Sequence, residues 1–474
     1  MRRSFLAYQG SSLLSDLGNS LTAVVLPLLV LQTTGSVLSA GWLALATGLP
    51  QFVAAAAGGV ALDRLNRRSV AVVGDLASAA SIGGLALVHA TSGLNLTWFI
   101  VFGCLSAVGD MPAMTAREAM APRLAEHSGV AIERVVAVRS GLSSAAIMVG
   151  PAVACLMIGW GIQNAALWTT AGLSALAALL GWTLPRTVGR VGADGASGSG
   201  TSQGGAVSPT SPSIATGGQP ADLHPWRELA DGVRHLFKDQ PLVRLVSLTS
   251  LVMACAVAIT QGLALPYLLL EAGKPGRVGV TLALMAVGVA IGAAVYGTAA
   301  RRWRARGFGL LGGALFVAGV WLLAVLPDFG WLLGAMTAMG AGAGLLGSVF
   351  ATVSVVSPDP ALRGRVLGNQ AALMLGFAPL ATLMAAFGIN QLGLPETLGS
   401  LAVIVTVTMV LTVTARSWRL APPPSGTSPG EATLDEVKSD EAAPERAVPD
   451  GAALDGPGRS GRRRLDPAER TESD

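Results

Sequence analysis

The sequence is short of charged residues. Asp, Glu, Lys and Arg make up 13% of its 474 residues, whereas 51% are hydrophobic, and the mean hydropathy is +0.57. An ordinary soluble domain has about 25% charged residues. This shortage excludes a soluble globular protein and predicts an integral membrane protein.

Cysteine and histidine are also scarce. Cys104, Cys155 and Cys255 all fall inside apolar segments and lack the spacing of metal ligands, which argues against a disulfide framework and against a zinc site. The 4 histidines are scattered through the chain without a catalytic motif, although a membrane enzyme would need clustered His, Cys, Ser and acidic residues. We therefore expect no enzyme activity, no cofactor and no metal site.

Twelve apolar runs are long enough to cross a bilayer. We expect helices at about 5–31, 37–62, 69–91, 95–116, 135–159 and 165–185, and then at about 242–270, 278–299, 308–327, 330–356, 366–390 and 396–416. The first run is too long for a signal-peptide core and has no clear cleavage site, so we expect it to be retained. The predicted fold is an all-α membrane protein made of two six-helix bundles.

The basic residues predict the orientation of this bundle. Before the distal tail, all of them except Lys274 and Arg277 fall in or beside the segments that share a side with the amino terminus. Cytoplasmic loops carry the excess of Lys and Arg, so we expect both termini in the cytoplasm. The basic clusters then anchor loops and do not form a nucleic-acid surface. Only three basic residues are lysine, which is typical of a GC-rich bacterial genome.

Composition divides the chain into five segments. We expect a first bundle at 1–190, a flexible linker at 191–223, an amphipathic helix on the inner membrane surface at 224–240, a second bundle at 241–418 and a disordered cytoplasmic tail at 419–474. The linker is almost entirely Gly, Ser, Thr, Ala and Pro, whereas the amphipathic segment has bulky apolar residues at helical spacing.

A charged hairpin joins the second and third expected helices, and it contains Gly59, Asp63, Arg64, Arg67 and Arg68. It resembles the signature cytoplasmic loop of the major facilitator superfamily. The resemblance implies that Gly59 lets two helices approach, that Asp63 lies near the positive end of a helix in the opposite half, and that Arg67 bonds an acid at the base of helix 4. We expect that acid to be Glu118. The alternative is a hairpin that only fixes topology.

The hairpin has a degraded copy in the second half. Gly297 with Arg301 stands at the place of Gly59 with Asp63, and Arg134 and Pro151 are echoed by Arg365 and Pro379. Two repeated six-helix halves are typical of transporters that rock around a central site. Because Arg301 replaces the acid, we expect a cytoplasmic gate that is stronger in the first half.

The fifth expected helix contains Gly141, Gly150 and Pro151. These residues partly resemble the glycine-rich signature of superfamily members that export by exchange with protons. Ala154 and Cys155 stand where that signature usually has a glycine pair. The alternative is ordinary close packing of membrane helices.

Acidic residues within membrane helices are costly and are candidates for function. Asp16 lies in the middle of helix 1 and Asp110 in helix 4, and both helices line the central cavity in the superfamily that the hairpin resembles. We therefore expect Asp16 and Asp110 to carry protons. The alternative is a structural role, with either acid salt-bridged to Arg117 or Arg139.

Helix 3 does not line that cavity, so we expect its acid, Asp75, to pair with a loop arginine such as Arg68. Helix 4, which we expect to end near residue 116, lacks the mid-membrane arginine of many drug-proton antiporters. The side chains that we expect to line the cavity are neutral or soft, which favours bulky amphiphilic molecules over sugars or phosphate. They include Asn19, Met253, Gln261, Met336 and Met339.

Three further stretches, Leu14 to Gly18, Trp226 to Pro241 and Arg363 to Val366, resemble the branch of macrolide-efflux and enterobactin-exporter proteins. The resemblance implies a monomeric secondary transporter in the bacterial inner membrane that exports drug-like compounds or secondary metabolites in exchange for protons. The alternatives are a siderophore exporter, a solute importer, and a membrane scaffold or sensor that transports nothing.

Overall fold

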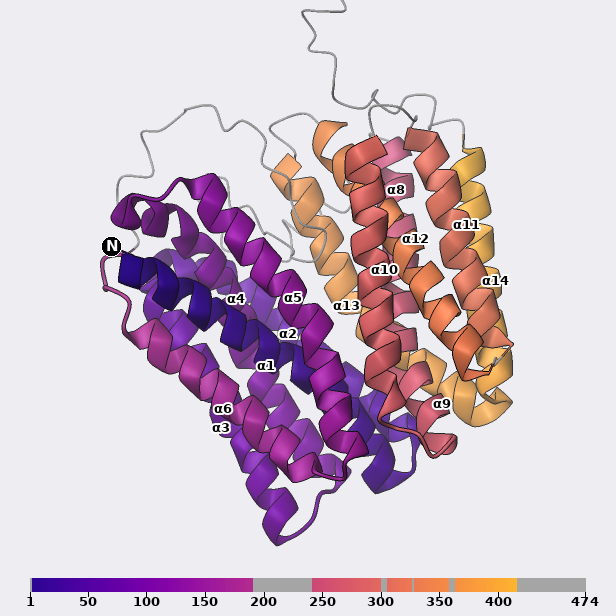
Figure 1. Ribbon diagram of the computed structural model, residues 1–474, viewed down its shortest axis with the longest axis horizontal. Coiled ribbons are helices and arrows are strands. Elements are labelled where there is room, and N and C mark those ends of the chain that lie inside the picture. The colour runs from indigo at the N-terminus through magenta and orange to yellow at the C-terminus, as the bar shows by residue number, and fades with distance from the viewer. Residues whose placement is uncertain (1, 191–240, 300–304, 326–327, 358–362, 416–474) are drawn as a thin grey trace, which may run out of the picture. The chain divides into compact units, whose positions relative to one another are not determined.

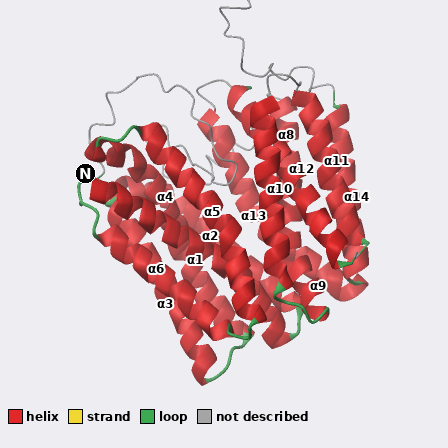
Figure 2. Cartoon of the chain, viewed as in Figure 1, coloured by secondary structure: helices red, strands yellow, loops and turns green. Residues whose placement is uncertain are grey.

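A computed structural model describes residues 2–190, 241–299, 305–325, 328–357 and 363–415. The side chains of residues 2, 56–64, 241, 305, 355–356 and 363–365 also lie outside the description, although their backbone is helical. The predicted linker at 191–223, the amphipathic helix at 224–240 and the tail at 419–474 lie outside the described residues. Helices and their connections form the described chain (Figures 1 and 2).

Six long helices form the first half, and their bounds are α1 (Arg2–Thr34), α2 (Val37–Arg64), α3 (Arg67–Thr91), α4 (Leu96–Ser128), α5 (Ile132–Gly159) and α6 (Gln163–Trp182). The connections are short because polar residues start some helices abruptly and a glycine ends another. Asn66 and Asn95 cap α3 and α4 by accepting bonds from the backbone of Arg68 and Trp98. Gly129 ends α4 in a left-handed conformation, with a φ of 66°.

The second half repeats this pattern, with bounds α8 (Pro241–Ile259), η2 (Thr260–Ala264), α9 (Leu265–Glu271), α10 (Arg277–Ala299), α11 (Ala305–Ala324), α12 (Phe329–Val356), α13 (Arg363–Leu392) and α14 (Leu394–Thr414). One predicted helix is divided by a π-helical turn, η2, into α8 and α9. The all-α prediction of two six-helix halves is confirmed.

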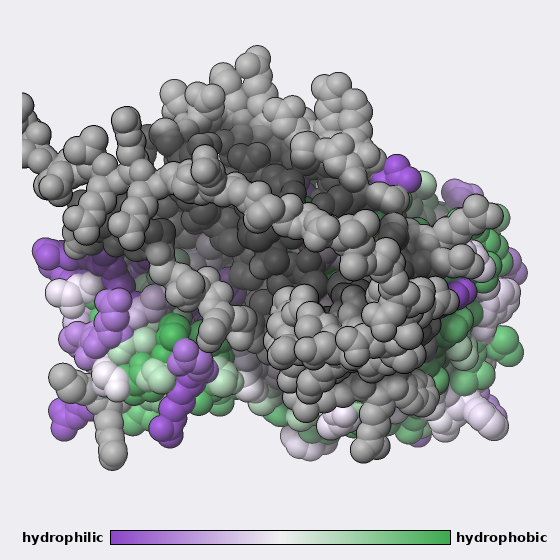
Figure 3. Space-filling model, turned by 90° about the horizontal axis from the view of Figure 1, so that it is seen from above, coloured by the Kyte–Doolittle hydropathy of each residue, from purple (hydrophilic) through white to green (hydrophobic). Residues whose placement is uncertain are grey.

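The helices have the length and the surface of membrane spans. Among the described residues, 12 helices are long and apolar enough to cross a membrane. Large apolar side chains such as Trp160, Leu179 and Val325 are exposed, and hydrophobic residues are visible beside hydrophilic ones at the edges of the molecule seen from above (Figure 3). Exposed apolar flanks of this kind fit a lipid environment.

Glycines let the two halves touch between α2 and α13. A methyl group added at Gly48 would lie 2.1 Å from Cγ of Pro379, and one added at Gly41 would lie 2.6 Å from Cβ of Ala386. The ring of Trp42 also meets that of Phe387, with 6.5 Å between centroids. Side chains larger than hydrogen at the two glycines would therefore force α2 and α13 apart.

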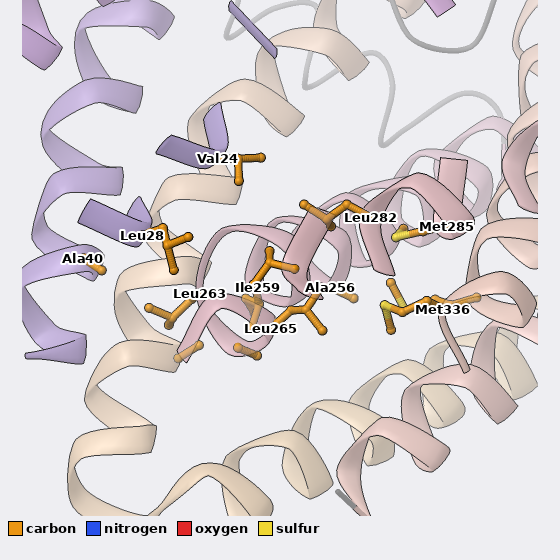
Figure 4. Packing of buried hydrophobic residues seen from close by; sticks show 14 of the residues in the cluster. Val24, Leu28, Ala40, Ala256, Ile259, Leu263, Leu265, Leu282, Met285 and Met336 are labelled. Atoms are coloured by element: carbon orange, nitrogen blue, oxygen red, sulfur yellow. The ribbon is translucent and has the colours of Figure 1, made fainter. Parts of the chain in front are cut away.

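A second contact joins α5 to α10. A methyl group added at Gly279 would lie 2.6 Å from Cβ of Cys155, and one at Gly159 would lie 3.0 Å from Cα of Gly276. Apolar residues of α1 and of the α8, η2 and α9 segment, including Leu28 and Leu263, lie in the same buried cluster (Figure 4).

These contacts lie toward one end of the helices. We call the end at which α1 begins and α2 turns into α3 the amino-terminal face, and the other end the distal face. Gly41 lies near the start of α2, Gly159 at the end of α5 and Ala386 near the end of α13, all toward the distal face. Toward the amino-terminal face, Gly141 and Gly297 have no atom within 4 Å of an added methyl group.

Candidate functional site

The charged hairpin lies at the amino-terminal face. Helix α2 ends at Arg64 and α3 begins at Arg67, so only Leu65 and Asn66 connect them. The side chains of Gly59, Asp63 and Arg64 lie outside the description, so their predicted roles stay predictions. Asn66 also donates through Nδ2 to the backbone oxygen of Arg186 at 3.1 Å, which ties the hairpin to the segment that follows α6.

The predicted ion pair between Arg67 and Glu118 is wrong. Arg67 does reach the carboxyl-terminal part of α4, but its Nη1 donates to the backbone oxygen of Ala119 at 2.8 Å. Glu118 instead accepts a bond from Nη1 of Arg139 on α5, at 3.3 Å. Glu118 thus pairs with the guanidinium on α5, and Arg67 bonds a backbone carbonyl of α4 instead.

The predicted pair between Asp75 and Arg68 is also wrong. Arg68 turns toward α6, where Nε donates to the backbone oxygen of Gly181 at 3.3 Å and the guanidinium lies 5.5 Å from the ring centroid of Trp182. Nη2 donates to the Trp182 backbone oxygen. Arg68 thus fastens the start of α3 to the end of α6.

Asp75 pairs with Arg117, through Oδ2 and Nη2, inside the first half. Both side chains are almost completely buried, with 3% and 4% of their surface exposed. Ser15 of α1 donates to Oδ1 of Asp75 at 3.0 Å, and Tyr8 of α1 donates to the backbone oxygen of Arg117 at 2.8 Å. This pair, which we call the locked pair, holds α1, α3 and α4 together.

The boundary of α4 differs from the predicted one, and it places this arginine inside the helix. Helix α4 continues to Ser128 instead of ending near residue 116, so Arg117 and Glu118 lie within the helix. The statement that helix 4 lacks a membrane arginine is therefore wrong. Continued helix formation through two charged residues is favourable here because each finds an opposite charge on a neighbouring helix.

Glu118 and Arg139 form a second pair, which we call the loose pair. It joins α4 to α5 by one bond of 3.3 Å, and its side chains keep 18% and 15% of their surface exposed. Nε of Arg139 is buried and has no hydrogen-bond partner among the described residues. The loose pair is held by fewer bonds than the locked pair and lies closer to solvent.

Asp16 lies on the side of α1 that faces α5. Four residues further along α1, Ser20 packs against Gly150 of α5, and Ser143 of α5 lies beside the Asp16 carboxyl. Oδ2 of Asp16 is buried and has no hydrogen-bond partner among the described residues. Ion pairing of Asp16 with Arg117 or Arg139, the structural alternative, is not formed, because both arginines are paired with other acids.

Asp110 lies on the face of α4 that packs against α3. Ser106 donates to its Oδ2 at 3.1 Å, and the hydroxyls of Ser106 and Ser78 of α3 are 3.0 Å apart. The helices approach closely here, because Gly74 and Gly109 pack against each other. Asp110 therefore lies where α3 and α4 pack together, and its role as a proton carrier stays a prediction.

The three motif residues of α5 have different surroundings. Gly150 packs against Ser20 inside the first half, and the backbone oxygen of Pro151 lies 2.8 Å from a methyl group added at Gly279 of α10. Gly141 is exposed and has no atom within 4 Å of an added methyl group. Along α5, the motif thus runs from Pro151, where the helix contacts the second half, to Gly141, where no neighbouring atom is close.

The methionines expected in the cavity belong to the hydrophobic core. Met336 and Met339 are completely buried and Met253 is 7% exposed, and Met336 packs beside Met285 in the second half (Figure 4). Gln261 is exposed and donates to Sδ of Met285 at 3.3 Å, whereas Asn19 is half-buried. Their apolar side chains make these methionines packing residues, so the prediction that they line a cavity is wrong.

A neutral polar cluster in the second half was not identified from the sequence. Nε2 of Gln370 on α13 donates to Oγ of Ser247 on α8 at 2.6 Å and to Oγ of Ser354 on α12 at 3.1 Å. The sequence separation between Arg134 and Arg365, which marked the repeat, also separates Arg139 from Gln370. The internal repeat is therefore the sequence feature that could have identified Gln370, and it makes Gln370 the counterpart of Arg139.

Comparison with known proteins agrees with this architecture. The multidrug efflux pump Tap of Mycolicibacterium fortuitum is 26% identical over 408 residues, which cover 85% of this chain and 93% of that protein. The pump of the same name from Mycobacterium tuberculosis is 26% identical over 411 residues and covers 85% of this chain and 91% of its own.

Two solved structures share the fold. The nucleoside transporter NupG has a TM-score of 0.67 at 15% identity and covers 88% of this chain and 100% of its own. The human organic anion transporter MFSD10 has a TM-score of 0.55 at 16% identity, covering 87% of this chain and 99% of its own. The family model described as Major Facilitator Superfamily matches residues 10–379. With twelve membrane helices in two repeated halves, this chain belongs to the Major Facilitator Superfamily.

Proposed function

We propose that this transporter exports amphiphilic drug-like molecules in exchange for protons, and that Asp16 carries the proton. The substrate class is supported by relatives named as multidrug efflux pumps, which align with 85% of the chain. The observation that carries the coupling is the position of Asp16, whose Oδ2 is buried without a partner between α1 and α5.

The balance of charge in the first half favours this role. In its described helices, six charged residues lie further from the amino-terminal face than the hairpin does. They are the acids Asp16, Asp75, Asp110 and Glu118 and the arginines Arg117 and Arg139. Each arginine is already paired with an acid. Asp16 and Asp110 are therefore left without an ion-pair partner, but Asp110 accepts a bond from Ser106 whereas Oδ2 of Asp16 has no partner among the described residues. Holding a proton spares Asp16 the cost of an unpaired buried charge.

The contacts between the halves support alternating access. We place the amino-terminal face in the cytoplasm, because Arg67, Arg123 and Arg134 lie toward it whereas Lys274 and Arg277 lie at the distal face. The halves then touch on the extracellular side, as expected of a transporter that faces inward. Rocking of the two halves would expose Asp16 to the other side. We expect a monomer in the bacterial inner membrane.

Flux measurements in proteoliposomes test the proposal. With ethidium and erythromycin as probes, wild-type protein should move the probe against its gradient when a pH gradient is imposed. Asp16→Asn should abolish this movement, because an amide cannot take up and release the proton. Asp328→Asn is the matched control and should retain it, because this acid at the distal face precedes α12 without making a side-chain capping hydrogen bond.

Two results would refute the proposal. Undiminished pH-driven movement by a double variant, Asp16→Asn with Asp110→Asn, would remove both acids from the coupling mechanism. A complete lack of flux by correctly inserted wild-type protein would favour a scaffold that transports nothing.

A further inference from the structure

Arg139 has an acid on each of two neighbouring helices. It bonds Glu118 of α4 through Nη1, while its buried Nε has no partner among the described residues. On the side of α1, Asp16 presents a buried Oδ2 that also lacks a described partner. An unused donor and an unused acceptor of opposite charge thus belong to adjacent helices.

The two groups are within reach of each other. Ser143, which lies beside the Asp16 carboxyl, is four residues beyond Arg139 on α5. Arg139 is therefore about one helical turn, or about 5.4 Å, closer than Asp16 to the amino-terminal face. An extended arginine side chain covers such a distance. The carboxyl of Asp16 and the guanidinium of Arg139 already interact electrostatically in this arrangement.

We propose that Arg139 exchanges carboxylate partners during transport, bonding Glu118 when Asp16 is protonated and Asp16 when that proton has left. This inference rests on the proposed function, because it takes Asp16 as the proton carrier. Arg139 acts through Asp16 as a positioning residue. When Asp16 loses its proton, the guanidinium of Arg139 on α5 would leave Glu118 of α4 and bond Asp16 of α1, which changes how these three helices are joined.

Arg117 cannot take this part, although it also carries charge near Asp16. Its pair with Asp75 is almost completely buried, and Ser15 donates to the second carboxylate oxygen of Asp75. The loose pair has a single bond and partial exposure, so exchanging its acid for another carboxylate costs less. Other charged and titratable groups near Asp16 or Arg139 are Tyr8 of α1, Asp75 of α3, and Arg117 and Glu118 of α4.

The second half provides a natural comparison for the switch. Gln370, at the repeat position of Arg139, bridges Ser354 of α12 and Ser247 of α8 at the same time. A neutral amide with neutral partners does not respond to a proton. The exchange of partners is therefore confined to the first half.

Dye binding by purified protein, followed by ethidium fluorescence anisotropy against pH, tests the exchange. Proton and dye compete, so the midpoint of binding reports the ionisation of Asp16. Arg139→Gln removes the cation that stabilises ionised Asp16 and should move the midpoint to higher pH by about one unit. Glu118→Gln frees Arg139 for Asp16 and should move it to lower pH by a similar amount.

Two further variants complete the experiment. Arg139→Lys keeps the positive charge and should restore most of the wild-type midpoint, which a purely structural loss would not do. Gln370→Met removes the equivalent hydrogen bonds in the second half and should leave the midpoint in place. Both are checked for wild-type elution from a size-exclusion column.

Opposite shifts for the two charge variants support the exchange. Shifts in the same direction, or an unmoved midpoint in Glu118→Gln, overturn it, and the second criterion holds even when Arg139→Gln does not fold. Failure of the proposed function is distinguishable, since it appears as a pH-dependent midpoint that Asp16→Asn leaves unchanged.

Discussion

The two halves of this transporter share a helical plan but hold it together with different chemistry. In the first half, one ion pair joins α3 to α4 and another joins α4 to α5. In the second half, equivalent helices are joined by neutral bonds, from Gln370 to Ser247 and Ser354 and between Thr249 and Thr412. Between described residues, the ion pairs that join helices lie in the first half.

This difference suggests how two repeated halves can have different functions in transport. A charge inside a membrane helix is expensive unless it is paired, so a half that carries paired and unpaired acids can change its packing when a proton arrives. A half joined by hydroxyl and amide groups keeps its packing at any physiological pH. Here the first half would respond to the proton, and the second half would move as a rigid body against it.

The largest expected effect breaks the locked pair. Asp75→Leu leaves Arg117 as an unpaired buried charge, which costs about 3 to 5 kcal/mol, so most of the protein should fail to fold or should unfold at much lower temperature. Thr249→Val in the second half removes one neutral bond, at a cost of about 1 kcal/mol. Thermal unfolding in detergent, followed by tryptophan fluorescence, measures both. Equal destabilisation would show that the two halves do not differ in this respect.

Most of the fold could be predicted from the sequence, because hydrophobic length and the arginine distribution dictate membrane helices. The predicted ends of α2, α5 and α12 lie within a few residues of the observed ones. The end of α4 was missed, because Arg117 and Glu118 look like loop residues until their partners on α3 and α5 are known. The π-helical turn at Thr260 has no comparable signal in the sequence.

The candidate site was predictable only in part. A buried acid in a membrane helix is unusual enough to identify Asp16 and Asp110 without a structure. Which charges pair is decided by helix rotation and depth, which hydropathy does not encode, and the predicted partners of Arg67 and Asp75 were therefore wrong. Hydropathy also gave no means of separating core methionines such as Met336 from cavity residues, because both lie on apolar faces.

A smaller effect is expected where the halves touch. Gly48→Val places atoms on Pro379, because even a single methyl group would lie 2.1 Å from Cγ of that residue. Overpacking of this kind costs about 1 to 3 kcal/mol, so the closed distal face should be disfavoured and ethidium flux should fall about tenfold. Gly368→Ala on α13, with no atom within 4 Å of the new methyl group, is the control. Similar losses in both variants would contradict a specific role for this contact.

The smallest effect is expected from giving the second half the charges of the first. Ser354→Glu combined with Gln370→Arg recreates the loose pair between α12 and α13, and a partly exposed pair contributes about 0 to 1 kcal/mol. The unfolding temperature should change little. The pH midpoint of dye binding should also stay in place, because the sequence of α8 contains no acid that could compete for the new arginine as Asp16 does for Arg139. A shifted midpoint would mean that any charge pair at this depth makes dye binding depend on pH. The difference between the halves would then come from the charge pair alone and would not require the unpaired carboxyl of Asp16.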